Sequence, residues 1–551
     1  MSRTPIAIID LFAGPGGLGE GFSSLEAPGG TGPAFNIALS VEKDPEASRT
    51  LRWRAFTRAL YRNGVAANTI IEELRSLAEP AVPEPAAISQ GKRGRIWKDA
   101  SNEALSEARQ IELGPETRDE VSQLIAKRVR KSDRWVLIGG PPCQAYSLVG
   151  RARNKGIADY SARDDKRHFL YREYLQVLGT HEPAVFIMEN VKGILSAKVD
   201  SLDIFQSILD DLRAPGRAIG LESGPTYSIH VLDAGGRLTK ASDSVVRMEL
   251  FGIPQRRHRV ILVGVRDDLK LDPGSLTRSP HPVASSLVLD DLPRLRSGLS
   301  RSADTWSAWS ALVRTTPAAK WVQGMTRPTR DEWGAEVARQ LNKLATGPAL
   351  GRGEDITAGP TEPAWNSAWY RRHPHDYVLN HSTRAHMASD LQRYLFAATF
   401  ARVAARSPNL HDFPPDLLPA HENLSAGAEM IFSDRFKVQI SNAPSSTVTS
   451  HIAKDGHYFI HSDPSQCRSL TVREAARLQT FPDDYYFCGG RTSQYTQVGN
   501  AVPPLLARQV AEVVHDALSG VPRKFDALAG LRRPTSEPAV TGDGAPTSSS
   551  T

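Results

Sequence analysis

A short loop around Cys143 holds the residues with the clearest chemical potential. It reads Gly139-Gly-Pro-Pro-Cys-Gln-Ala-Tyr-Ser147 and follows an apolar run, Trp135–Ile138, that predicts a buried strand. Open α/β sheets bind ligands at the carboxyl ends of their strands, and two prolines stiffen this loop. A thiolate there would be a strong nucleophile, whereas a lone cysteine could instead be an inert buried side chain. The polar neighbours Gln144 and Ser147 favour the nucleophile.

A glycine-rich turn near the N-terminus indicates a second site. The sequence Asp10-Leu-Phe-Ala-Gly-Pro-Gly-Gly17 follows the predicted strand Ile6–Phe12 and opens a helix, although its spacing is not that of the dinucleotide motif. Glycines allow close backbone approach to a ligand, and a helix N-terminus offers free N–H groups. Glu42, at the end of the strand Phe35–Val41, suits a ribose hydroxyl. Together they suggest a nucleoside cofactor, while a purely structural turn stays possible.

A carboxylate and an arginine-rich strand complete the reactive residues. Glu189 ends the predicted strand Ala184–Met188 and suits proton exchange with a substrate, but it could also be an ordinary exposed strand end. The run Gln255-Arg-Arg-His-Arg259 leads into another β-rich stretch. Strand alternation would put Arg257 and Arg259 on one side, opposite Arg256 and His258. A solvated basic edge is the alternative.

Strands and helices must alternate to position these residues. Further β-rich runs are Tyr227–Leu232 and Arg259–Val265, and helical stretches such as Arg167–Leu178 and Leu202–Leu212 lie between strands. A helix should follow the second strand, with Asp44 as N-cap and Pro45 in its first turn. This alternation predicts an α/β fold with a doubly wound sheet. Thr471-Val-Arg-Glu474 predicts a capping box that opens a helix through Gln479.

The 551 residues are too many for one core, so we expect two domains. From about residue 270 the alternation stops, and 272–440 is irregular, proline-rich and holds six of the nine tryptophans. The segment 63–131 is polar and helix-leaning; its basic run 91–95 suits a solvated loop better than a phosphate contact. The segment 235–248 resembles an insertion, and 521–551 has the composition of a disordered tail.

Composition limits the class of protein. A net charge of +6 permits a polyanionic partner without proving one. Three cysteines without a CxxC pair indicate neither zinc nor disulfides and fit a reducing compartment. No apolar run approaches the ~20 residues that span a bilayer, and no export signal is expected. The irregularly spaced His373, His375, His381 and His386 do not predict a metal site.

Five motifs, in this order, resemble the DNA (cytosine-5) methyltransferase family of bacterial restriction-modification type. They are Asp10–Gly17, Pro141-Pro-Cys143, Glu189-Asn-Val191, Gln255–Arg259 and Gln497-Val-Gly-Asn-Ala-Val-Pro503. Asp165-Lys-Arg167 and Leu470–Pro482 are similar to the family too, so the resemblance covers about 5–266 and 441–510. It implies a Rossmann-like catalytic domain of the class I S-adenosylmethionine-dependent methyltransferases, at 1–270 plus 494–520. A smaller target-recognition domain would occupy 271–493, with the family motif at 441–482.

The resemblance also implies the site residues. Cys143 would attack carbon 6 of cytosine, Glu189 would assist at ring nitrogen 3, Arg259 would hold the base's carbonyl oxygen, and Arg257 would support Glu189 or the substrate. The methyl donor S-adenosylmethionine would be bound by Phe12, Gly14, Gly16, Glu42, Pro142, Leu170, Asn500 and Val502. Gln144 and Ser147 would contact DNA, and no metal would be needed. The chain departs from some relatives at Lys43, where an aromatic often stacks on adenine, and Asp99 is only a weak candidate for the third motif.

The unmatched block 270–440 is the natural reader of the DNA sequence. Its arginines are interleaved with aromatic residues that suit core packing better than base contacts: Arg371, Arg372, Arg384 and Arg393 among Trp365, Trp369, Tyr370 and Tyr377. Arginine reads guanine in the major groove.

We expect a monomer in the bacterial cytoplasm, associated with the nucleoid through double-stranded DNA. Because a single catalytic module is present, a cognate restriction endonuclease is a possible genetic partner. Two rivals stay open: an RNA cytosine-5 methyltransferase, and a catalytically dead DNA-binding regulator, against which intact Cys143, Glu189, Arg257 and Arg259 argue.

Overall fold

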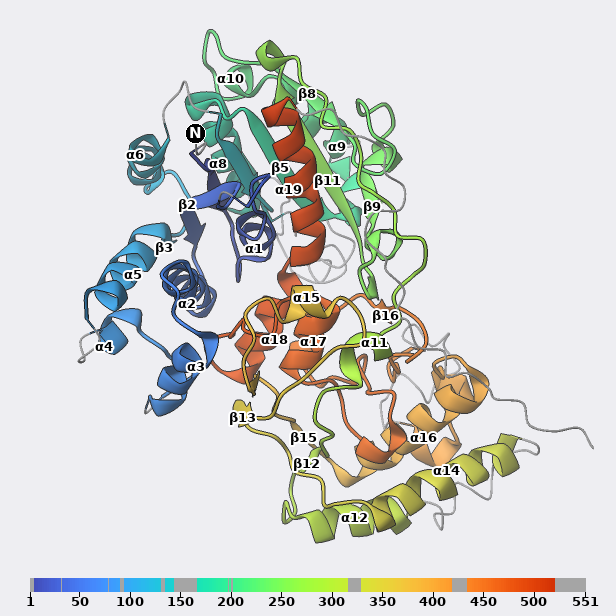
Figure 1. Cartoon of the computed structure of the whole chain (residues 1–551). Helices are drawn as coiled ribbons and strands as arrows, with labels where there is room; N and C mark the ends of the chain where they lie inside the picture. The colour runs from blue at the N-terminus through green and yellow to red at the C-terminus, as the bar shows by residue number, and fades with distance from the viewer. Residues whose placement is uncertain are drawn as a thin grey trace, which may run out of the picture.

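The computed structural model of the chain is shown in Figure 1. It describes residues 4–30, 32–77, 79–89, 94–129, 134–142, 166–196, 198–199, 202–315, 329–418 and 434–520. Cys143, Gln144 and Ser147 lie outside these residues, as do most of the basic run 91–95 and the tail 521–551.

One twisted sheet organises the first half of the chain, and its strand order is β3-β2-β1-β4-β5-β11-β8. The first five strands are parallel, β11 runs antiparallel to both of its neighbours, and β9 pairs with the start of β11. The strands are β1 Ile6–Leu11, β2 Phe35–Glu42, β3 Ala108–Gln110, β4 Val136–Gly139, β5 Val185–Val191, β8 Tyr227–His230, β9 Val245–Arg247 and β11 His258–Arg266. The predicted α/β class and doubly wound sheet are confirmed. The stretch 235–248, expected to be an insertion, supplies β9 to this sheet.

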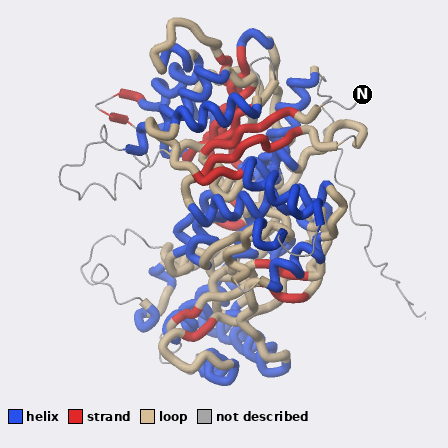
Figure 2. Tube along the Cα trace, turned by 90° about the vertical axis from the view of Figure 1, so that its left-hand side faces the viewer, coloured by secondary structure: helices blue, strands red, loops and turns tan. Residues whose placement is uncertain are grey.

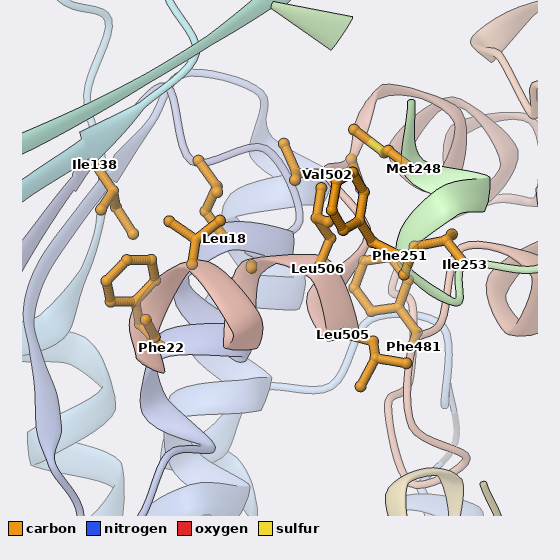
Figure 3. Close-up of a cluster of buried hydrophobic side chains, with 14 of the residues drawn as sticks. Leu18, Phe22, Ile138, Met248, Phe251, Ile253, Phe481, Val502, Leu505 and Leu506 are labelled. Atoms are coloured by element: carbon orange, nitrogen blue, oxygen red, sulfur yellow. The ribbon is translucent and has the colours of Figure 1, made fainter. Parts of the chain in front are cut away.

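Helices cover both faces of the sheet because its strands are apolar on both sides (Figure 2). Ile8 packs with helices α1 and α19 on one face, and the next residue, Ile9, packs with α6, α8 and α9 on the other. Figure 3 shows the first of these layers, where Phe22 of α1 lies beside Ile138 of β4, and Leu18, Leu505 and Leu506 belong to the same cluster. These helices are α1 Gly17–Ser23, α6 Arg118–Arg128, α8 Lys166–His181, α9 Ile204–Arg213 and α19 Pro504–Ser519; α10 Pro215–Ala218 and the short pair β6 Lys198–Val199 and β7 Leu202–Asp203 lie nearby in the chain.

Helix α2, Pro45–Arg62, begins as predicted. The Asp44 carboxylate accepts hydrogen bonds from the backbone N–H groups of Glu46 and Ala47, which satisfies donors that the helix leaves free. The polar stretch that follows folds into three helices packed beside α2, and it ends in the edge strand β3. These helices are α3 Ala67–Ser76, α4 Pro85–Ser89 and α5 Gly94–Glu107.

The central block occupies the lower half of Figure 1 and has a core of its own. Trp309, Trp333, Tyr394 and Phe396 pack there. The aromatic residues for which core packing was expected lie in other clusters: Trp369 and Tyr370 are buried in the cluster that contains α1 and α19, Trp365 packs against that cluster, and Tyr377 packs against the cluster around α2. Its helices are α11 Ser286–Leu289, α12 Trp306–Thr315, α14 Thr329–Thr346, α15 Ser367–Tyr370 and α16 Ala388–Ala404, and its strands are β12 Gly298–Leu299, β13 Ile356–Ala358, β14 Tyr377–Leu379 and β15 Ala385–His386.

The C-terminal segment returns to the sheet. Helix α17, Val472–Leu478, starts at the predicted capping box, in which the Thr471 hydroxyl accepts from the Glu474 backbone N–H and the Glu474 carboxylate accepts from the Thr471 N–H. Helix α18, Arg491–Asn500, then leads into α19. Strand β16, Ser445–Ser446, pairs with β10, Gln255–Arg256, just before β11. The described part of the chain holds no helix long and apolar enough to cross a membrane.

Candidate active site

A cavity of about 450 Å³ lies at the carboxyl ends of β1, β2, β4 and β5, where ligands of open α/β sheets bind. Most of the residues predicted to bind the cofactor line it: Phe12, Gly14, Glu42, Pro142, Leu170, Asn500 and Val502. Glu189 lines the same cavity, so the predicted catalytic carboxylate and the predicted cofactor residues share one space.

The glycine-rich turn has positive φ angles at several positions, a conformation that favours glycine. Gly14 and Gly16 have φ angles of 55° and 92°, and Phe12 also lies in the left-handed region at 56°. A Cβ on Gly17 would come within 2.2 Å of the Val502 carbonyl oxygen, so only glycine allows the turn at 502 to approach. Gly16 is not among the residues that line the cavity; a Cβ there would meet Leu51 and the Tyr485 hydroxyl.

Glu42 ties this turn to the second strand. One of its carboxylate oxygens accepts the Gly14 backbone N–H at 2.8 Å, and the other accepts the Asp44 N–H at 2.8 Å. An ionised carboxylate offers about four acceptor positions, so two remain for ligand hydroxyls. Glu42 therefore shapes the turn and presents acceptor capacity to the cavity.

Several residues of the cavity wall were missed by sequence reasoning. Ile111 and Leu113 follow the short strand β3, which has too few residues to stand out as a strand in the sequence. Ser493 and Thr496 belong to a stripe with Gln497 and Asn500 along one face of α18; that stripe follows the i, i+3, i+4, i+7 spacing and could have been found from Asn500.

Asp10 is a further unpredicted member of the wall. Its side chain is fully buried at the end of β1. Burial, and next the negative charge of Glu42, raise the pKa of this carboxyl well above its usual range.

Glu189 forms an ion pair with Arg259, whose Nε lies 3.1 Å from the carboxylate Oε1. Both side chains are about one-seventh exposed, with fractions of 13% for Glu189 and 14% for Arg259, and Glu189 lines the cavity. The pair joins neighbouring strands, because Arg259 of β11 is registered against Val191 of β5. The geometry brings together two of the residues that the family resemblance places at the substrate base, Glu189 and Arg259.

The loop that leads to Cys143 is anchored beside this pair. The buried Asn190 side chain donates from Nδ2 to the Pro141 carbonyl at 3.1 Å. A Cβ on Gly140 would lie 3.2 Å from Glu189 Oε2, so the backbone of the loop passes close to that carboxylate. Cys143 follows Pro142, the last described residue of the loop, and lies with Gln144 and Ser147 outside the described residues.

Arg257 lies in a different environment from Arg259. It is fully buried, and its Nη1 donates to the backbone carbonyls of Val448 at 2.7 Å and Gly499 at 3.3 Å. Burial, and next the nearby Arg259 charge, lower the pKa of Arg257 to about 9. Its hydrogen bonds tie the start of β11 to two C-terminal segments rather than to Glu189.

The four arginines singled out in the central block all have partners within the chain. Arg371 donates to the His375 carbonyl, Arg384 to the carbonyls of Ile452 and Lys454, and Arg393 to the Leu417 carbonyl and Asp390. Arg372 pairs with Glu20 of α1. Arg372 and Arg384 thus join the central block to other segments, whereas Arg371 and Arg393 form hydrogen bonds within it.

The four central histidines are likewise part of the packing. His375, His381 and His386 are buried, and His373 stacks on Tyr61 of α2 with ring centroids 3.8 Å apart. Within the described ranges, no group of three histidine, cysteine, aspartate or glutamate residues could hold a metal ion.

Comparison with known proteins agrees with this geometry. The family model for C-5 cytosine-specific DNA methylases matches residues 110–516. The chain is 31% identical over 540 residues to the type II methyltransferase M.Bpa9945I of Bacillus paralicheniformis, covering 93% of this chain and 99% of that protein. It is 29% identical to the type II methyltransferase M.AgeI of Thalassovita gelatinovora, over 70% of this chain and 83% of that protein.

A third relative is the DNA (cytosine-5-)-methyltransferase M.ApeKI of Aeropyrum pernix, with 25% identity over 71% of this chain and 82% of that protein. The family match spans most of the chain and includes the strands that carry Glu189 and Arg259. The chain belongs to the family of C-5 cytosine-specific DNA methylases and is a DNA (cytosine-5-)-methyltransferase.

Proposed function

We propose that this enzyme methylates carbon 5 of a cytosine flipped out of a specific duplex DNA sequence, and that it protects host DNA in a restriction-modification system. The observation that carries the proposal is that Glu189, which lies in the wall of a cavity suited to a nucleoside cofactor, forms an ion pair with Arg259. The names of the relatives in Bacillus and Thalassovita, both type II methyltransferases, support the biological role.

The residues of the cavity fit S-adenosylmethionine, which the family uses. The volume falls within the range of about 300–1,000 Å³ typical of small-molecule sites. Glu42 has free acceptor positions for ribose hydroxyls, and the glycine turn brings backbone within reach of the ligand. Phe12, Leu170 and Val502 add apolar walls. When bound, the cofactor supplies an electrophilic methyl group.

Carbon 5 of cytosine is a poor nucleophile, and addition of Cys143 to the ring would activate it. The Cys143 thiolate adds to carbon 6, forming a carbon–sulfur bond and moving the ring electrons towards carbon 5 and nitrogen 3. Glu189 donates a proton or hydrogen bond at nitrogen 3, and Arg259 holds Glu189 and the base's carbonyl oxygen. Carbon 5 takes the methyl group, then loses its proton to a base, and the returning electron pair expels Cys143 as thiolate.

A cytosine within a duplex is out of reach of such a cavity. Flipping it out costs a few kcal/mol, which contacts to the flanking DNA must offset. We assign the catalytic domain to 1–270 plus 494–520 and target recognition to 271–493, with Gln144 and Ser147 at the entrance and double-stranded DNA between the two parts. The enzyme would act as a monomer, with a restriction endonuclease as its genetic partner.

Duplexes that carry 5-fluorocytosine in place of cytosine test the mechanism. Fluorine at carbon 5 blocks the final elimination, so the native enzyme should form a covalent DNA adduct that survives denaturing electrophoresis. Cys143→Ala should form none, whereas Cys467→Ala, which alters a buried thiol with a raised pKa, should still form it.

Bisulfite sequencing of DNA from cells that express the enzyme identifies the recognition sequence on which to run this test. Absence of an adduct on that sequence would contradict the mechanism, and methylation of transfer RNA without DNA would contradict the substrate.

A further inference from the structure

Tyr485 contacts the cofactor turn from outside the cavity. Its hydroxyl donates a hydrogen bond to the carbonyl of Pro15, a residue of the cavity wall. Burial keeps the pKa of this hydroxyl above its usual range, so it stays protonated and remains a donor. We infer that Tyr485 is a positioning residue for the cofactor: it holds the turn at 12–17 in the shape that binds S-adenosylmethionine.

The turn depends on such a contact because its backbone is strained. Phe12 adopts a φ of 56°, a conformation that costs a side chain of its size energy and persists only where surrounding contacts impose it. Gly14 is held by Glu42, and Gly17 lies against the Val502 carbonyl. Tyr485 holds Pro15, between these two points, and no other side-chain hydrogen bond to Pro15 is present among the described residues.

The tyrosine ring is itself locked in place. It is 1% exposed and packs against Phe481 and Phe487, with ring centroids 4.8 and 5.3 Å away. Arg54, which lies on α2, places its guanidinium 4.9 Å from the centroid of the Tyr485 ring. The hydroxyl is therefore aimed at Pro15 by rigid surroundings.

Four buried charges fix those surroundings. Arg54 donates to Glu20 of α1 at 2.7 and 2.8 Å and to Asp484, next to Tyr485, at 2.7 Å. Arg372 of the central block also pairs with Glu20. Two carboxylates thus meet two guanidinium groups, and removing any one would leave an uncompensated buried charge. This quartet joins α1, α2, the central block and the segment that carries Tyr485.

The matched pair Tyr485→Phe and Tyr486→Phe tests the inference, which rests on the proposed cofactor site. Each variant keeps a buried ring and loses one hydroxyl. The Tyr486 hydroxyl donates to Asp355 at 2.7 Å and touches no part of the cofactor turn. Titration calorimetry with S-adenosylmethionine in the absence of DNA measures binding without methyl transfer.

Tyr485→Phe should weaken cofactor binding roughly three- to tenfold, the loss expected for one hydrogen bond. It should also speed amide hydrogen exchange in the peptide that spans 12–17, while kcat at saturating cofactor stays within about twofold. Tyr486→Phe should leave both cofactor affinity and that exchange unchanged. Thermal melting of both variants without ligand reports any general loss of stability.

Equal cofactor affinity in the two variants, or unchanged exchange at 12–17, would overturn the role of Tyr485. Failure of the native protein to bind S-adenosylmethionine would instead contradict the proposed cofactor site.

Discussion

Glu189 combines an accessible carboxylate with a fixed position. Arg259 pairs with it from the neighbouring strand, and the Pro141–Pro142 loop is held beside it by Asn190. A group that transfers a proton must lie within hydrogen-bond reach of the reacting atom. The ion pair holds Glu189 at the cavity wall, where a flipped base could meet it.

Replacing Glu189 by glutamine should therefore slow methyl transfer by about 10²-fold or more, the usual size of an acid–base contribution. Glutamine retains the shape and can still donate a hydrogen bond, but it loses the charge that pairs with Arg259 and cannot transfer a proton. Single-turnover methylation measures the chemical step, and a DNA mobility shift should show near-native binding. Glu249→Gln is the control, because Glu249 pairs with His258 at 2.8 Å and does not line the cavity. A rate within threefold of the native enzyme would remove Glu189 from the mechanism.

Arg257 is expected to matter for stability. Arg257→Met should lower the free energy of unfolding by roughly 1–3 kcal/mol, because the buried carbonyls of Val448 and Gly499 lose a donor. Urea denaturation measures this loss. The exposed neighbour Arg256→Met should change the free energy of unfolding by less than about 0.5 kcal/mol. Equal free energies of unfolding in the two variants would show that the hydrogen bonds of Arg257 to Val448 and Gly499 do not stabilise the fold.

At the scale of elements, α1 and α19 approach closely because α1 has a glycine at the contact. A Cβ on Gly21 would lie 2.4 Å from the Ala507 Cβ and 2.5 Å from the Pro504 carbonyl. This contact packs the C-terminal helix against α1, which directly follows the glycine-rich turn. The glycine thus lets two elements far apart in the sequence pack against each other next to the cavity, whose wall includes Gly17 and Leu18 of α1.

Gly21→Ala should consequently destabilise the protein by roughly 1–3 kcal/mol through overpacking, as seen in urea denaturation. Gly334→Ala is the matched control, since Gly334 lies within helix α14 and a Cβ there would meet nothing within 4 Å. Alanine is the better helix former, so this control should hold or gain up to about 1 kcal/mol. Similar losses in both variants would contradict close packing of α1 and α19.

At the scale of the whole molecule, buried neutral histidines lie where the central block meets the rest of the chain. Burial lowers the pKa of His373, His381 and His461 to about 4. His381 is held between Thr471 and the Pro293 carbonyl, and His373 stacks on Tyr61. Protonation would place charges inside this junction.

Stability should therefore fall as the pH drops from about 6.5 to about 4. The unfolded chain takes up these protons near pH 6.5, whereas the folded protein resists them until about pH 4. Arginine partners lower the pKa values of the buried carboxylates Glu474 and Asp484. The stabilisation that these two carboxylates contribute is therefore lost only below about pH 4.5. Calorimetric melting at pH 7.5, 6 and 5 measures the effect. A melting temperature that does not change over this range would contradict it.

The sequence by itself determined the alternating α/β fold and the order of the motifs, and the family resemblance added seven of the residues that line the cavity. Local chemistry sufficed for the fold: apolar runs predict strands, Asp44 and Thr471 cap helices, and glycines permit the turn at 14–17. Phe12 and Glu42 then meet at one edge because the parallel strands β1 and β2 end there.

Only the tertiary structure decided which charged residues face the cavity and which hold the molecule together. Strand alternation placed Arg257 beside Arg259, but packing turned Arg257 towards the carbonyls of Val448 and Gly499. The contact between Tyr485 and Pro15 joins residues 470 positions apart, and the Glu20–Arg54–Asp484–Arg372 quartet spans the chain in the same way. Such pairings depend on how distant segments pack, and no local pattern or spacing encodes that packing.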